Sequence, residues 1–194
     1  MITVKVGNNG TTFPVHESVV CDSSAFFKFA MKPEWTSATS RIVDLTDEDP
    51  DVFEIYLHWL YFKTLSTIQG RPPSADMEYI ELAQCYVLGE KLLDVKFKNA
   101  IMDALVEVLE NEQKGTCILP GSWAIETIYE GTTEGSPARI LLVAMWIGRA
   151  APSCKVTLNK CHPEFIIDLA KGFLELDVAV TSPWKDSMEK YYEK

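Results

Sequence analysis

The chain has 194 residues, of which 47% are hydrophobic and 24% are charged, and its formal net charge at pH 7 is −10. This balance is typical of a folded globular protein and excludes a largely disordered chain. The negative charge argues against a nucleic-acid partner, because proteins that bind phosphate backbones carry basic stripes.

The cysteines and the apolar runs indicate the compartment. Five cysteines are scattered along the chain, at Cys21, Cys85, Cys117, Cys154 and Cys161. An odd number without a regular spacing predicts free thiols in a reducing compartment. The N-terminus has no basic-then-apolar signal pattern, and no apolar run reaches the ~18 residues that a spanning helix needs. We therefore expect a cytoplasmic or nuclear protein without membrane contact.

The first 45 residues predict three short strands. In residues 2–6, apolar side chains alternate with Thr3 and Lys5, which is the pattern of a half-buried strand. The Asn-Asn-Gly turn at 8–10 predicts a tight hairpin, and Phe13 and Val15 continue the alternation on a second strand. A third strand is expected over residues 41–45.

Helical spacing of apolar residues predicts most of the remaining chain. Asp49 and Pro50 fit the N-cap and the first helical position of one helix, and Gly89 is expected as the C-cap that separates two others. Asp22, Ser23 or Ser24 is expected to cap the second helix. The expected helices begin near residues 16 and 25 and then cover 50–61, 76–88, 94–109, 123–130, 137–150, 163–176 and 184–192.

Polar residues with Gly115, Pro120 and Gly121 interrupt the helical pattern near 111–121. This interruption predicts a boundary between an α+β domain over residues 1–110 and a helical C-terminal extension over residues 111–194.

Three blocks of residues carry a family resemblance. They are a strand that leads into a helical hairpin, a capped helix that ends in a Leu-Tyr pair, and a further helix. They comprise Phe13, Val15-His16, Val19-Val20, Ser24, Phe27, Asp49-Pro50, Phe53, Trp59-Leu60-Tyr61, Leu82-Ala83, Tyr86-Val87-Leu88-Gly89 and Lys91-Leu92. In this order they resemble the BTB/POZ domain over about the first 110 residues. The resemblance implies an α+β fold, with a three-stranded sheet packed against about five helices, and a protein–protein interaction platform with no catalytic residues, cofactor or metal.

The remaining residues are similar to the helical extension of fungal BTB proteins. The similarity rests on Ile125, Ile128-Tyr129-Glu130, Ser136-Pro137, Arg139, Leu141-Leu142-Val143, Pro163-Glu164-Phe165 and Asp168-Leu169.

The family resemblance leaves several functions open. One is a scaffold or adaptor that pairs with itself or with other proteins, although the segment that many BTB homodimers exchange is not found before the first strand. Another is a substrate adaptor of a cullin-type ubiquitin ligase. Cullin-binding members tend to carry a hydrophobic-x-Glu motif, and Trp35-Thr36-Ser37 lacks the glutamate. An enzyme would need a nucleophile–base or metal motif, and a transcription-factor fragment would need basic residues for direct DNA contact.

Two groups of residues are candidates for protein contacts. Trp35, in a polar loop, either folds back onto the core or anchors an interface, because aromatic side chains dominate binding energy. Phe62 and Lys63 are expected on the same face as Trp35. The partner-binding candidates are Trp35, Asp47, Glu48, Phe62 and Lys63, and the self-association candidates are Val19, Val20, Phe26 and Phe27.

Other polar residues have structural explanations. The acidic run at 47–54 fits a helix start, where carboxylates meet the positive end of the helix dipole. His16, between a strand and a helix, is expected to form a structural hydrogen bond, and His58 is expected to pack or lie at the surface. Cys154, Cys161 and His162 lack the close ligand pairs of a structural zinc site.

Overall fold

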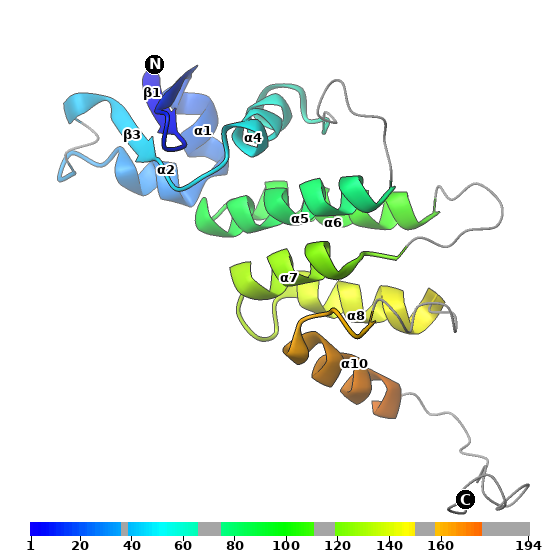
Figure 1. The fold of residues 1–194 in the computed structure, drawn as a ribbon. Helices are drawn as coiled ribbons and strands as arrows, with labels where there is room; N and C mark the ends of the chain where they lie inside the picture. The colour runs from blue at the N-terminus through cyan, green and yellow to red at the C-terminus, as the bar shows by residue number, and fades with distance from the viewer. Residues whose placement is uncertain (36–38, 66–74, 111–118, 150–157, 176–194) are drawn as a thin grey trace, which may run out of the picture.

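A computed structural model describes residues 1–35, 39–65, 75–110, 119–149 and 158–175. The expected helix at 184–192 lies outside these residues. The described elements are β1 (Ile2–Val6), β2 (Thr11–Val15), α1 (Glu17–Ser23), α2 (Ala25–Ala30), β3 (Ile42–Leu45), α4 (Pro50–Phe62), α5 (Ala75–Lys91), α6 (Val95–Glu110), α7 (Ser122–Gly131), α8 (Pro137–Arg149) and α10 (Pro163–Glu175). The sheet with α1, α2 and α4 forms one end of the molecule, and the later helices stack away from it in layers (Figure 1).

The sheet is mixed and has the order β2-β1-β3. β1 pairs antiparallel with β2 and parallel with β3, so that Val4 lies between Phe13 and Val43. The alternate residues Ile2, Val4 and Val6 are almost fully buried. The alternation in the sequence thus predicted the inner face of the central strand correctly.

The helical hairpin α1–α2 is fixed by one serine. Ser24 is the N-cap of α2, where its Oγ accepts a hydrogen bond from the Phe27 N–H at 3.2 Å. The same hydroxyl donates to the Leu92 carbonyl at 2.5 Å. A buried serine therefore links the hairpin to the end of α5, and the prediction of a cap at this position is confirmed.

α4 begins as the sequence predicts, with Asp49 as N-cap and Pro50 as the first helical residue. Asp49 Oδ1 accepts from the Asp51 N–H at 2.8 Å. The helix ends at Lys63, which has left-handed backbone angles (φ 58°). Its buried Tyr56 donates to Asp94 at 2.9 Å, so that α4 is tied to the start of α6.

The predicted C-cap at Gly89 is wrong, because α5 continues through this glycine to Lys91. A Cβ at Gly89 would lie 2.8 Å from Lys98 Cγ and 3.2 Å from Phe97 Cδ1. The glycine allows α6 to pack closely against α5 rather than ending the helix. The chain reverses at Leu93, whose φ is 52°.

The C-terminal helices share a core with the N-terminal part. One cluster of buried side chains extends from Ile2 to Leu169. α7 packs on α5, and α10 packs on α8, where Gly172 approaches Val143 and Ile147. The division of the chain at residue 110 stays a prediction. None of the described helices is both long and apolar enough to cross a membrane.

Candidate interaction surfaces

The α1–α2 hairpin contains the self-association candidates, and the structure divides them into two kinds. Val20 and Phe27 have no exposed surface in the single chain, since their side chains lie in the core. Val19 and Phe26 are half-buried, and Phe29 on the same hairpin is 52% exposed. Only the latter three side chains present apolar surface to a partner.

The turn between α5 and α6 extends this apolar surface. The carbonyls of Leu92 and Leu93 accept hydrogen bonds from the Phe26 and Ala25 N–H groups, at 3.3 and 3.4 Å. These bonds place the turn against the start of α2, where the side chain of Leu93 is 52% exposed and that of Val95 is 61% exposed. We call Val19, Phe26, Phe29, Leu93 and Val95 the hairpin surface.

Leu93 is held in an unusual backbone conformation. Its φ of 52° is left-handed, which costs a non-glycine residue roughly 1–2 kcal/mol. Hydrogen bonds from α2 to this turn offset that cost. Strained residues held by their surroundings cluster at functional sites, and this one presents a leucine to solvent.

Charged groups of both signs surround the hairpin surface. Lys96 and Asp22 form an exposed ion pair at 3.8 Å. Lys32 Nζ lies 4.5 Å above the ring of Phe29. An apolar centre with a mixed polar rim is the usual composition of a protein–protein interface.

Trp35 does not fold back onto the core, because 61% of its side chain is exposed. Its N–H donates to the Lys32 carbonyl at 3.0 Å, in a turn that directly follows α2. Of the two alternatives for this residue, the structure favours an aromatic group available to a partner.

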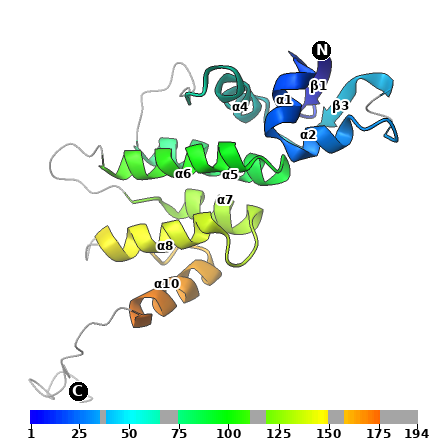
Figure 2. The ribbon, with the colours of Figure 1, turned by 180° about the vertical axis from the view of Figure 1, so that it is seen from behind.

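The other partner-binding candidates lie in or beside α4, whereas Trp35 follows α2. Phe62 is 69% exposed at the end of α4, which lies on the opposite side of the domain from the loop after α2 in both views (Figures 1 and 2). Lys63 Nζ lies 4.1 Å from the centre of the Trp59 ring. Glu48 pairs with Lys91 at 2.7 Å, and Asp47 is exposed. The expected shared face of Trp35 and Phe62 is therefore wrong.

The histidines of the BTB region form structural contacts. His16 donates its backbone N–H to the Tyr61 hydroxyl at 3.1 Å, and its Nδ1 lies 2.9 Å from the same oxygen. This confirms the predicted structural hydrogen bond of His16, which links the start of α1 to the last turn of α4. His58 Nδ1 lies 2.8 Å from the Thr64 carbonyl oxygen and helps to close the end of that helix.

The described cysteines Cys21, Cys85 and Cys161 are thiols. Burial raises the pKa of Cys85 to about 12 and that of Cys161 to about 11. Protonated thiols are poor nucleophiles and poor metal ligands. Cys154 lies outside the described residues, within which no three His, Cys, Asp or Glu side chains are grouped to hold a metal ion.

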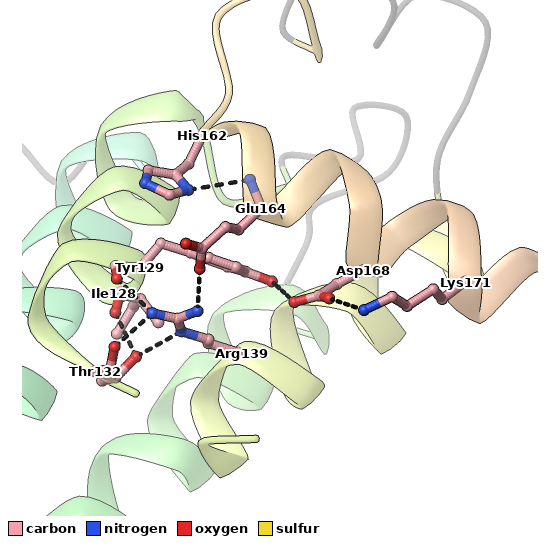
Figure 3. A network of polar contacts seen from close by, with 8 residues as sticks. All are labelled: Ile128, Tyr129, Thr132, Arg139, His162, Glu164, Asp168 and Lys171. Carbon is pink, nitrogen blue, oxygen red and sulfur yellow. Dashed lines mark hydrogen bonds and ion pairs between the residues drawn. The ribbon is translucent and has the colours of Figure 1, made fainter. Parts of the chain in front are cut away.

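A polar network among α7, α8 and α10 centres on Arg139, which is only 6% exposed (Figure 3). Its guanidinium donates to the Tyr129 carbonyl at 2.6 Å and to both the carbonyl and the hydroxyl of Thr132. It also pairs with Glu164 of α10 at 2.6 Å. Arg139 therefore caps the C-terminus of α7 and holds α10 beside it.

Tyr129 extends this network to the next turn of α10. Its hydroxyl donates to Asp168 at 3.1 Å, and its ring stacks on that of His162 (Figure 3). Burial and the neighbouring Asp168 carboxylate raise the pKa of Tyr129 above its ordinary range. Sequence patterns do not reveal these roles, because the hydrogen-bond partners lie up to 39 positions apart along the chain.

Comparison with known proteins agrees with the fold. No curated protein matches the sequence. The family model of the BTB/POZ domain matches residues 2–94, which contain the whole sheet, α1, α2, α4 and α5 and end just before α6. BTB/POZ domains are protein–protein interaction modules and not a family of enzymes. The match and the observed α+β fold together identify residues 2–94 as a BTB/POZ domain.

Proposed function

We propose that this protein is a scaffold or adaptor of the cytoplasm or nucleus that joins proteins through the hairpin surface. The observation that carries the proposal is the group of half-buried and exposed apolar side chains that two separate segments, α1–α2 and the α5–α6 turn, bring together. Single exposed apolar residues need no explanation, but a contiguous group marks an interaction site.

We further propose that a second copy is the first partner of this surface. A two-fold contact places the same surface on both subunits, and Lys32, Lys96 and Asp22 at the hairpin surface allow a lysine of one copy to face the aspartate of the other. Full burial of one large apolar side chain contributes about 1.5–3 kcal/mol. The helical part after α6, which resembles the extension of fungal BTB proteins, remains available for other contacts.

The mass in solution over a concentration series tests this proposal. We expect a species of twice 21.8 kDa by light scattering, and we expect Phe29→Lys to shift it to a single chain. Phe62→Lys is the matched control, because Phe62 is also exposed but lies on the other side of the domain. A wild-type chain that stays monomeric at every concentration contradicts self-association. Equal effects of both substitutions contradict the placement of the contact.

A second candidate function is a substrate adaptor of a cullin-type ubiquitin ligase, and the exposed Trp35 favours it. An aromatic anchor beside the α2–β3 loop offers a hydrophobic contact without the glutamate that cullin-binding relatives tend to carry. Retention of a cullin on the immobilised protein, lost in Trp35→Ala and kept in Phe62→Ala, supports this function. No retention of a cullin by the wild-type protein rejects it.

A further inference from the structure

α10 presents an apolar face on the side opposite its buried residues. Phe165 and Leu169 lie in the core, and Gly172 lies against Val143 and Ile147 of α8. The opposite side carries five exposed apolar residues, which we call the α10 face. They are Ile166, Ile167, Ala170, Phe173 and Leu174. Ala170 lies three or four positions from each of the other four, so the five form one stripe along the helix.

The exposed area of this stripe is large for one helix. Its four larger side chains are 37%, 54%, 48% and 86% exposed, in chain order. Together they leave on the order of 400 Å² of apolar surface in solvent, a size at which exposed patches are often functional. α10 is also the outermost of the described helical layers in both views (Figures 1 and 2). The α10 face is therefore accessible to a partner.

The charged residues of α10 lie along one border of this face. Glu164, Asp168, Lys171 and Glu175 follow one another at four-, three- and four-residue steps. Asp168 is turned toward α7, where its carboxylate accepts from Tyr129 (Figure 3). Glu164 and Lys171 each have 59% of the side chain exposed. The border thus offers a negative and a positive group that lie seven positions apart.

We propose that the α10 face binds the α10 face of a second copy in an antiparallel two-fold contact. A two-fold axis across the helix gives both copies the same contact surface and places the start of one helix beside the end of the other. When Ile167 of one copy lies opposite Ala170 of the other, Ile166 lies beside the partner's Phe173. The small side chain of Ala170 allows the two helices to approach closely.

This register also pairs opposite charges. With Ile167 opposite the partner's Ala170, Glu164 of each copy lies beside Lys171 of the other, so the contact contains two ion pairs related by the axis. The apolar stripe and the charged border are therefore complementary to themselves in a single register. This charge complementarity is the reason to assign the α10 face to a second copy rather than to an unrelated helix.

The size of the contact predicts a weak association. Two copies bury about 800 Å² of apolar surface between them, which is below the size of a standard interface. The contact is therefore expected only at high protein concentration, and the single chain expected for Phe29→Lys applies below that range. The α1–α2 hairpin and α10 lie toward different ends of the described structure (Figure 1). The α10 contact thus goes beyond the hairpin surface and does not depend on it.

Zero-length carbodiimide cross-linking of the full chain at high concentration tests the proposal. An equal mixture of unlabelled and heavy-isotope-labelled Phe29→Lys chains is cross-linked, and the linked peptides are identified by mass spectrometry. We expect a Glu164–Lys171 link that joins one labelled and one unlabelled chain. The two residues of one chain cannot form it, because seven helical residues separate them by about 10 Å. The Asp168–Lys171 pair of one chain, at 3.4 Å, shows whether the reagent reaches α10.

The double variant Ile167→Gln, Leu174→Gln, made in the same Phe29→Lys chain, is expected to lose the mixed link. Neither substitution adds an amine or a carboxylate, and both side chains are largely exposed, so the fold is expected to persist. Circular dichroism checks that the helical content is unchanged. Val106→Gln is the matched control, because Val106 is a partly exposed apolar residue on another helix, α6. It is expected to keep the mixed link.

Two results overturn the proposal. One is the absence of the mixed link at every concentration while the Asp168–Lys171 link forms, and the other is a mixed link that survives the double variant. Because the test uses the Phe29→Lys chain, its result is separate from that of the hairpin surface. A wild-type chain that does not pair through the hairpin contradicts the proposed function, and a mixed link in Phe29→Lys still supports the α10 contact.

Discussion

At the scale of single residues, Asp94 connects α4 to the start of α6. It has no exposed surface, its Oδ1 accepts from the Phe97 N–H at 3.0 Å at the start of α6, and its Oδ2 accepts from Tyr56 of α4 at 2.9 Å. A buried carboxylate is stable in a fold only when hydrogen bonds replace its lost hydration. Asp94 is therefore both a helix cap and the partner that fixes α4.

We expect Asp94→Ala to lower the free energy of unfolding by roughly 2–4 kcal/mol. The substitution leaves the Tyr56 hydroxyl and the Phe97 N–H buried without an acceptor, and each such group costs about 1–3 kcal/mol. Urea unfolding followed by circular dichroism measures the change. Asp49→Ala, at the exposed cap of α4, is the control and is expected to cost about 1 kcal/mol. Equal losses in the two variants contradict the role of Asp94.

Two buried tyrosines predict a loss of stability in alkali. Burial, with Asp94 beside Tyr56 and Asp168 beside Tyr129, raises the pKa of both hydroxyls above the ordinary value of 10.0. The folded chain therefore binds these protons more tightly than the unfolded chain. This stabilisation is complete below pH 10 and is lost as the pH rises above it.

We expect the free energy of unfolding to fall from about pH 10 upward, and to fall less steeply in Tyr56→Phe and Tyr129→Phe. Urea unfolding at pH 8, 9.5 and 10.5 measures the slope. Tyr61→Phe, at a side chain that is 42% exposed, is the control and is expected to keep the wild-type slope. Identical slopes in all four proteins contradict the assignment.

At the scale of elements, Arg139 holds three helices with one guanidinium. We expect Arg139→Met to lower the free energy of unfolding by roughly 2–4 kcal/mol, because the carbonyls of Tyr129 and Thr132 lose their buried donor. Glu164→Gln tests the ion pair alone. Glu164 is 59% exposed, so we expect a loss below about 1 kcal/mol. Urea unfolding measures both, and a larger loss in Glu164→Gln places the main contribution in the ion pair instead.

Some elements of the fold can be predicted from the sequence, and others cannot. Local signals predict β1, the start of α4 at Asp49-Pro50 and the cap at Ser24, because alternation and capping depend on neighbouring residues. The end of α5 was misplaced, because Gly89 serves a contact with α6 rather than a helix end. Burial of Val20 and Phe27 and the network of Arg139 depend on residues far apart in sequence, which periodicity does not reveal.

For the candidate surfaces, the sequence left open whether Trp35 folds back onto the core, and it did not separate the buried Val20 and Phe27 from the more accessible Val19 and Phe26. It did not indicate that the α5–α6 turn completes the hairpin surface. The exposed state of Leu93 and Val95 follows from the reversal at φ 52°. Leu93 falls between the two expected helices and Val95 at the start of the second, and neither position alone indicates an exposed side chain beside α2.

At the scale of the whole molecule, the contact between α5 and α7 joins the BTB region to the later helices. Gly131, at the end of α7, lies against Val87 of α5, and a Cβ on this glycine would lie 2.3 Å from Val87 Cγ2 and 2.5 Å from Cγ1. Such distances leave no room for a methyl group. The core is continuous across this contact, so strain here affects both parts of the chain.

We expect Gly131→Ala to lower the free energy of unfolding by roughly 1–3 kcal/mol, as overpacking does, and to leave a single cooperative transition. Val87→Ala removes both methyl groups that oppose the new Cβ, so the double variant is expected to be more stable than the sum of the two single losses predicts.

Gly148→Ala is the control, since nothing lies within 4 Å of its added Cβ in α8. There the helix propensity of alanine is expected to add up to about 1 kcal/mol. Two separate transitions in urea, with only the second one shifted by Gly131→Ala, would show that the helices after residue 119 unfold independently of the BTB/POZ domain.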